Sequence, residues 1–194
     1  IRKRNLARVT AGFKEHKVVP DVLDSVPLSS AGVFYSSATK AFMSQGNELT
    51  PTQVKDSPQL VVWGTEPNAL YTLLMIDPDA PSRTDPKFGE ALHWLVVNIP
   101  GTDLAKGETF AEYVGAGAPK GTGLHRYVLL VYKQPDRITP DEKHVTNTSR
   151  EGRRSFSIRA FAGKYQLGQP VAGNLYLAQY DDYVPTLQEQ LSRG

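Results

Sequence analysis

Cysteine is absent from the 194 residues of this chain. The absence excludes a thiol nucleophile, a thiolate metal site and any disulfide bond. A cysteine-free chain fits a reducing compartment, although secreted proteins can also lack cysteine. We therefore expect a cytoplasmic protein and leave secretion or an organelle open.

The chain also lacks a strong charge of either sign and a long apolar run. Its 22 lysines and arginines stand against 20 aspartates and glutamates, so the formal net charge is only +2. That balance does not indicate a nucleic-acid partner. No apolar run approaches the roughly 20 residues that a membrane-spanning helix needs. We expect no transmembrane segment and leave peripheral membrane contact open.

Common catalytic motifs are missing as well. The sequence has no Gly-x-Ser-x-Gly elbow, and Ser82 lies beside a proline without an evident base. It has no His-Glu-x-x-His metal motif. We expect a protein that is not an enzyme and that has no cofactor and no metal. The alternative is a hydrolase or metal site that uses Asp77, His93 and His125.

The N-terminal segment differs from the rest in its charge. Residues 1–15 begin with Ile1, and Arg2, Lys3, Arg4 and Arg8 have no acidic residue near them before Glu15. This segment is compatible with a processed targeting sequence, a boundary of the chain or a helix ended by Pro20. No internal repeat or long linker follows, so we expect one domain over residues 16–194.

Short apolar runs separated by Gly, Pro, Asp and Ser dominate the remaining sequence and indicate strands. These runs cover residues 31–35, 60–63, 70–76, 92–99, 124–132 and 175–180. In the run 124–132 both alternating sets of side chains are largely apolar, which is typical of a central strand covered on both faces. The sequence predicts a mainly β fold with peripheral helices.

Two further segments favour short helices. Ile158, Phe161 and Tyr165 follow helical spacing, with Ser155 as the expected N-cap. A second helix is expected to begin near Pro185.

Candidate binding residues lie where the apolar runs begin or end. Asp77 follows the run 70–76, while His93 and His125 lie at the start of two other runs. One carboxylate and two imidazoles at strand ends can converge on a pocket. Gly115 and Gly117 can offer backbone N–H groups to an anion, because glycine adopts turn conformations that aim consecutive amides at one point.

These residues, taken in order with several other motifs, resemble the phosphatidylethanolamine-binding protein family, which includes the Raf kinase inhibitory proteins. The resemblance covers roughly residues 16 to 191. It includes the segments Asp77-Pro78-Asp79-Ala80-Pro81, Gly121-Thr122-Gly123-Leu124-His125-Arg126-Tyr127, Tyr113-Val114-Gly115 and Asp181-Asp182-Tyr183-Val184-Pro185.

The resemblance implies a large central β-sheet flanked by a smaller sheet and short helices. It also implies a pocket that binds small anions such as phosphoethanolamine, with a protein kinase or protease as a partner, in a chain that we expect to be a monomer. Pocket residues carried over from the family are Asp77, His93, Gly115, Gly117, Pro119, His125 and Tyr127. An interaction protein with a vestigial pocket stays open as an alternative.

Departures from the family pattern concern the pocket rim. Phe88 stands where many members have a tyrosine, and Gln188 stands where mammalian members bring a tyrosine over the mouth. With Ala91 and Leu191, they predict a wider and less aromatic rim. The resemblance also implies a cis Asp77–Pro78 bond. Asp79, Arg83 and Asp85 are interpreted as a turn that pins its own loop.

Overall fold

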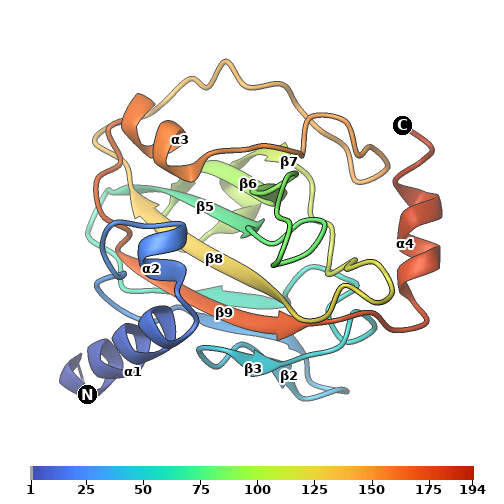
Figure 1. The fold of residues 1–194 in the computed structure, drawn as a ribbon. Coiled ribbons are helices and arrows are strands. Elements are labelled where there is room, and N and C mark those ends of the chain that lie inside the picture. Colours follow the sequence, from blue (N-terminus) through green and yellow to red (C-terminus); the bar gives the residue numbers. More distant parts are fainter. Residues whose placement is uncertain (1) are drawn as a thin grey trace.

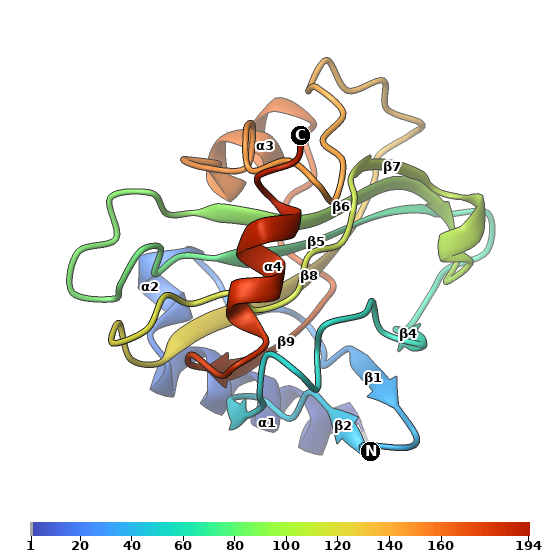
Figure 2. The same ribbon diagram turned by 90° about the vertical axis from the view of Figure 1, so that its right-hand side faces the viewer.

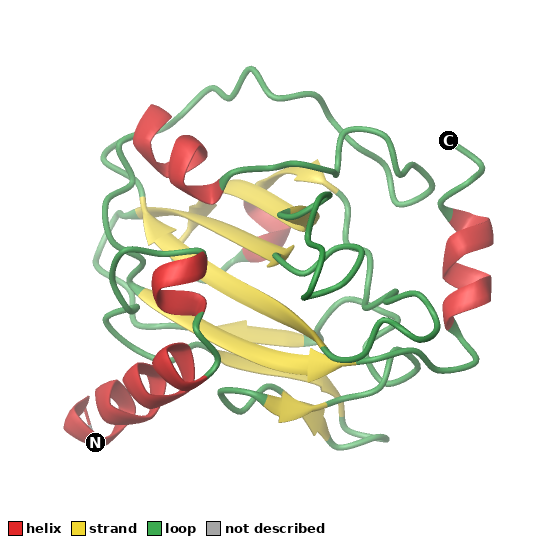
Figure 3. Ribbon diagram, in the orientation of Figure 1, coloured by secondary structure: helices red, strands yellow, loops and turns green. Residues whose placement is uncertain are grey.

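The computed structural model describes residues 2–194 and has two β-sheets with helices at their periphery (Figures 1 and 3). The helices are α1 (Arg2–Glu15), α2 (Val18–Asp21), the 3₁₀ helix η1 (Leu104–Lys106), α3 (Ile158–Lys164) and α4 (Val184–Gln190). The strands are β1 (Gly32–Ser36), β2 (Ala41–Phe42), β3 (Asn47–Glu48), β4 (Leu60–Val62), β5 (Leu70–Asp77), β6 (Ala91–Pro100), β7 (Glu108–Ala111), β8 (His125–Lys133) and β9 (Ala172–Ala178). The mainly β prediction is confirmed.

The larger sheet has six strands in the order β3-β9-β8-β5-β6-β7. All neighbouring pairs are antiparallel except β3 with β9. Strands β5 and β8 lie in the middle, and almost all of their side chains are buried. The apolar run 124–132 is therefore a central strand, as its double-sided pattern predicted.

Each face of the large sheet packs on a different layer. The small sheet, in the order β2-β1-β4, contributes Val33, Tyr35 and Val61 to the core on one face. Helices α1 and α3 contribute Phe13 and Phe161 to a second core on the other face. Figure 2 shows α4 apart from both layers, standing across the ends of the large-sheet strands.

The helix boundaries differ from those predicted. Helix α1 ends at Glu15, before Pro20, and Pro20 lies within α2 after a kink at Val19. Helix α3 is capped by Ser157, whose hydroxyl accepts a hydrogen bond from the Ala160 amide at 3.2 Å. Ser155 is not the cap, because its backbone has a positive φ of 56° and its amide pairs with the Phe88 carbonyl. No helix among residues 2–194 is both long and apolar enough to cross a bilayer.

The predicted cis bond at Asp77–Pro78 is wrong. The cis peptide bonds of the described chain are Val19–Pro20, Ala80–Pro81 and Gly89–Glu90. The Asp77 carboxylate is instead oriented by a tight turn, in which its Oδ1 accepts a hydrogen bond from the Asp79 amide at 2.7 Å.

Candidate functional site

A cavity of about 530 Å³ opens at the ends of β5, β6 and β8, beneath α4. Its wall contains every residue predicted for the pocket and its rim. These residues are Asp77, Phe88, Ala91, His93, Gly115, Gly117, Pro119, His125, Tyr127, Gln188 and Leu191. The structure thus brings together residues from five separate segments of the sequence; that they bind a ligand stays a prediction.

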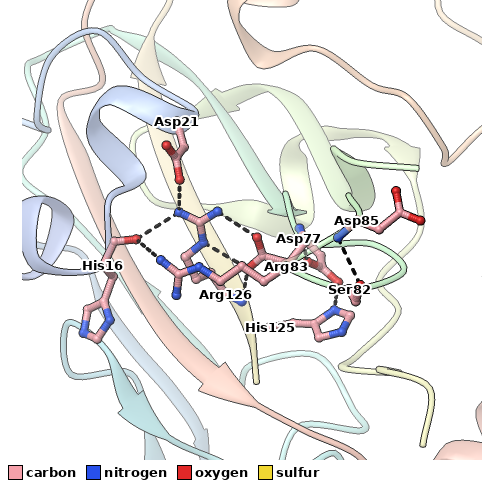
Figure 4. Close-up of polar contacts among 9 residues, drawn as sticks. His16, Asp21, Asp77, Ser82, Arg83, Asp85, His125 and Arg126 are labelled. Carbon is pink, nitrogen blue, oxygen red and sulfur yellow. Dashed lines mark hydrogen bonds and ion pairs between the residues drawn. The ribbon is translucent and has the colours of Figure 1, made fainter. Parts of the chain in front are cut away.

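Asp77 and His125 form a hydrogen-bonded pair at the floor of the cavity (Figure 4). Asp77 Oδ2 lies 2.7 Å from Nδ1 of His125, and both side chains are buried. The pair forms because β5 and β8 are antiparallel neighbours, so the end of β5 lies beside the start of β8. Sequence separation alone, 48 residues, gives no sign of it.

The second nitrogen of His125 is also engaged. Its Nε2 lies 2.9 Å from the hydroxyl oxygen of Thr122, and that hydroxyl donates to the Pro119 carbonyl at 2.8 Å. Both ring nitrogens of His125 therefore have partners within the protein, Asp77 at Nδ1 and Thr122 at Nε2, and the imidazole orients the floor of the cavity.

His93, unlike His125, has a partner in the described chain at only one of its ring nitrogens. Its Nδ1 donates to the Val114 carbonyl at 2.9 Å, which fixes the tautomer and leaves Nε2 without a partner among the described residues. Burial lowers the pKa of His93, and the opposing influences of Asp77 and the Val114 carbonyl do not restore it. His93 is therefore neutral at pH 7, with a lone pair available at the cavity wall.

Tyr127 lies between the two histidines. Its ring meets His93 edge-on at 5.3 Å between centroids and stacks on Tyr176 at 5.0 Å. Burial raises its pKa well above the usual value, and the charge of Asp77 raises it further. The buried hydroxyl has no hydrogen-bond partner in the part of the chain that the structure describes.

The two predicted glycines are also required by packing. Neither Gly115 nor Gly117 has a positive φ. A Cβ at Gly115 would overlap the carbonyl oxygen of Val54, and one at Gly117 would lie 2.9 Å from Leu187 of α4. Glycine thus allows close packing against the neighbouring loop and helix, and the binding of an anion by the two amides stays a prediction.

The rim of the cavity is formed by α4 and by the segment 150–154. Gln188 donates to the Gly117 carbonyl at 3.1 Å and accepts from Arg150, which ties the helix to both walls. Arg154 lies over the Phe88 ring at 4.1 Å. Phe88 therefore brings no hydroxyl group to the rim, unlike the tyrosine that many family members have here. The cation of Arg154 lies against its ring instead.

Sequence reasoning missed the arginines at the cavity. Arg150, Arg153 and Arg154 line it, as does Lys120. Arg153 is buried, and its guanidinium donates only to backbone carbonyls, including those of Glu112 and Thr146 at 2.8 Å. Their clustering, three arginines within five residues, was the feature of the sequence that could have indicated a basic rim.

The side of β8 away from the cavity holds a separate charged network (Figure 4). Asp79 is buried and accepts three hydrogen bonds from Arg126, two of them at 2.9 Å and one at 2.7 Å. Arg126 also binds Asp21 at 2.7 Å. The expectation that Asp79 and Arg83 pin their own loop is wrong, because Asp79 binds β8 and Arg83 reaches the His16 carbonyl. Strand alternation explains the geometry, since Arg126 points opposite to His125.

Within residues 2–194, no three His, Cys, Asp or Glu side chains lie together in an arrangement that could hold a metal ion. Ser82 contacts Thr84 and the Asp85 amide, and it makes no hydrogen bond to a histidine.

Comparison with known proteins agrees with this geometry. The family profile described as phosphatidylethanolamine-binding protein matches residues 39–177. The chain belongs to this family.

Relatives span nearly its whole length. A Drosophila melanogaster protein provisionally named odorant-binding protein A5 is 41% identical over 179 residues, covering 92% of this chain and 84% of the relative. The solution structure of CG7054 is 51% identical, with a TM-score of 0.72, covering 90% of this chain and 97% of that one. A carboxypeptidase Y inhibitor, solved in complex with its cognate proteinase, is 28% identical, with a TM-score of 0.76, covering 91% and 97%.

Proposed function

We propose that this member of the phosphatidylethanolamine-binding protein family is a non-enzymatic binding protein whose cavity takes a small anionic head group. The observation that carries the proposal is the free Nε2 of His93 beside a buried polar floor, under a rim with three cationic side chains. The Asp77 carboxylate is already hydrogen-bonded to His125 and to the Asp79 amide, so its oxygens are not left free to face an incoming anion.

His93 is the proposed contact for the anion. In the free protein it is neutral, so an anion binds best when the imidazole takes up a proton and donates from Nε2. Arg150, Arg154 and Lys120 at the rim draw anions toward the mouth. The unpartnered hydroxyl of Tyr127 supports a further hydrogen bond at the floor, to a ligand atom or to a water beneath it.

The walls of the cavity suggest that the ligand also has an apolar part. Leu92, Leu187 and Leu191 line the same space as the polar floor. We expect phosphoethanolamine to bind in the millimolar range, at about 4 kcal/mol, because it makes few contacts. A short-chain lysophosphatidylethanolamine below its micelle concentration should bind more tightly.

The test is an NMR titration with phosphoethanolamine. Amide signals of Gly115, Gly117 and His125 should shift, and His93→Gln should weaken binding roughly ten-fold, the loss of one charged hydrogen bond. The matched control is His144→Gln, because His144 is exposed and does not line the cavity. Shifts confined to other regions would exclude this cavity as the binding site.

A hydrolase is the enzymatic alternative, and one observation favours testing it. Thr122, His125 and Asp77 form a hydrogen-bonded chain in the order of nucleophile, base and acid. Thr122 does not line the cavity, however, and its hydrogen goes to the Pro119 carbonyl. We expect no turnover of nitrophenyl esters above buffer. Turnover that disappears in Thr122→Ala would overturn the non-enzymatic proposal.

A protease partner is a second candidate function, favoured by the similarity to a carboxypeptidase Y inhibitor over 91% of this chain. Purified protein should then slow peptide cleavage by carboxypeptidase Y in a saturable manner. Unchanged cleavage at a large excess of protein would exclude this protease and leave a kinase partner to be tested.

A further inference from the structure

The outer face of the small sheet exposes large apolar side chains that no other part of the described structure covers. An antiparallel sheet with one face in solvent normally alternates apolar residues inward and polar residues outward. In β1, β2 and β4 the inward set is apolar, as expected, but most of the outward set is apolar too, with Ser36 as the polar exception. Four outward side chains are 39–50% exposed: Phe34, Phe42, Leu60 and Val62.

These four side chains form one patch. Phe34 on β1 is directly opposite Phe42 on one side and Leu60 on the other. The Phe34 and Phe42 rings are 6.4 Å apart, and Val62 lies opposite Gly32. A contiguous exposed apolar patch of this kind marks an interaction surface. We call these four residues the sheet patch.

Basic side chains of α1 adjoin the sheet patch. Arg4 and Arg8 line a groove that also contains Phe42 and Gly32, and Arg8 donates to the Ser44 hydroxyl at 3.0 Å. Lys40 is exposed in the turn that joins β1 to β2. Neither the three strands nor the groove contains an acidic residue. The overall charge of +2 therefore conceals a local surplus of positive charge here.

We propose that the sheet patch and the basic side of α1 together dock on an anionic lipid bilayer. Exposed aromatic and branched aliphatic side chains enter the head-group boundary, while neighbouring arginines and lysines contact anionic lipids. A second copy of the chain is disfavoured as the occupant, because symmetric pairing would bring the two sets of cations together. The cavity is not part of this surface, because none of the four patch residues lines it. Figure 2 shows that α4, which forms part of the cavity rim, lies apart from β1 and β2.

The test is co-sedimentation with phosphatidylcholine vesicles in which about one lipid in three is phosphatidylserine. Native protein should pellet with these vesicles and should remain in solution with pure phosphatidylcholine. Phe34→Ser with Phe42→Ser should reduce partitioning roughly ten-fold, and Arg4→Gln with Arg8→Gln at least about five-fold. Leu124→Ser and the pair Lys106→Gln with Lys143→Gln are the matched controls, which should sediment like the native protein.

Each other outcome counts against the proposal. Equal losses in the patch and control variants, or equal binding to neutral vesicles, would overturn it. So would a loss of sedimentation in saturating phosphoethanolamine, because that result would mean that the cavity holds the lipid. A concentration-dependent dimer abolished by the two Phe→Ser changes would assign the patch to a second copy. Thermal unfolding and phosphoethanolamine titration of the patch variants should match those of the native protein, which separates this test from that of the cavity.

Discussion

Two carboxylates that are two residues apart have separate roles on opposite faces of β8. Asp77 orients His125 at the cavity, whereas Asp79 holds Arg126 on the other face. The sequence suggested the first role through the family motif. It did not suggest the second, because nothing local to Asp79 indicates that its partner lies 47 residues away on a neighbouring strand.

Removal of Asp79 should destabilise the fold severely. Asp79→Ala leaves the buried Arg126 guanidinium without its main partner, and breaking such a pair typically costs about 3–5 kcal/mol. Urea unfolding would measure the loss. Asp24→Ala, which removes an exposed ion pair with Arg159, is the control and should change stability little. Similar midpoints for the two variants would contradict the assigned role of Asp79.

Sulfate binding should strengthen as pH falls, because His93 must take up a proton to donate to an anion. Sulfate keeps its charge in this range, whereas phosphate monoesters do not. Burial lowers the pKa of free His93 below its ordinary value of about 6.5, so affinity should still be rising as the pH falls below about 6.5.

Calorimetry at several pH values would measure the rise. In His93→Gln the affinity should be flat across the same interval, while His144→Gln should behave as the native protein does. A pH response that survives in His93→Gln would assign the proton uptake to another group.

At the scale of elements, periodicity predicted strands well and helix ends poorly. The runs 70–76 and 92–99 became β5 and β6, because a short continuous apolar run bounded by turn residues is typical of a strand that is buried on both faces. The start of α3 was misplaced by two residues, since Ser155 and Ser157 are equally good caps by composition. The choice between them depends on the pairing of 155–156 with the loop at 88–90, which is a tertiary contact.

Glu90 links that loop to α3. Its Oε1 accepts the Ile158 amide at 3.0 Å, at the start of the helix. Burial raises its pKa to about 7, although the Ile158 amide and Arg159 act in the opposite direction. The folded state thus holds the Glu90 proton more tightly than the unfolded state does, so this residue's stabilising contribution is lost as pH rises from about 4.3 through about 7.

Glu90→Gln keeps an acceptor for the Ile158 amide and removes the charge. The melting temperature of this variant should therefore exceed that of the native protein at pH 8, and the two should converge near pH 4. Glu151→Gln, at an exposed site, is the control. A variant that loses stability equally at both pH values would show that the carboxylate is not protonated in the fold.

At the scale of the whole molecule, the cavity is an assembly of strand ends, loops and α4, and family membership rather than periodicity predicted its residues. Family membership did not predict the arginines of the segment 150–154. Their hydrogen-bond partners are mostly backbone carbonyls, and a carbonyl leaves no signature in a sequence.

Chelation should leave the thermal stability of the protein unchanged, because the cavity floor is held by hydrogen bonds between Asp77, His125 and Thr122. Scanning calorimetry before and after exhaustive dialysis against a chelator measures this. A fall in melting temperature of several degrees that zinc reverses would restore the metal-site alternative.

The short turn from Asp77 to Asp79 gives the cavity a mechanical connection to the opposite side of the protein. Asp77 Oδ1 holds the Asp79 amide, Asp79 holds Arg126, and Arg126 holds both Asp21 and the His16 carbonyl, which join α1 to α2 (Figure 4). If ligand binding in the cavity stabilises this series of hydrogen bonds, amide exchange should slow at the junction of α1 and α2, far from the ligand. Deuterium uptake at residues 16–22 would then report on cavity occupancy.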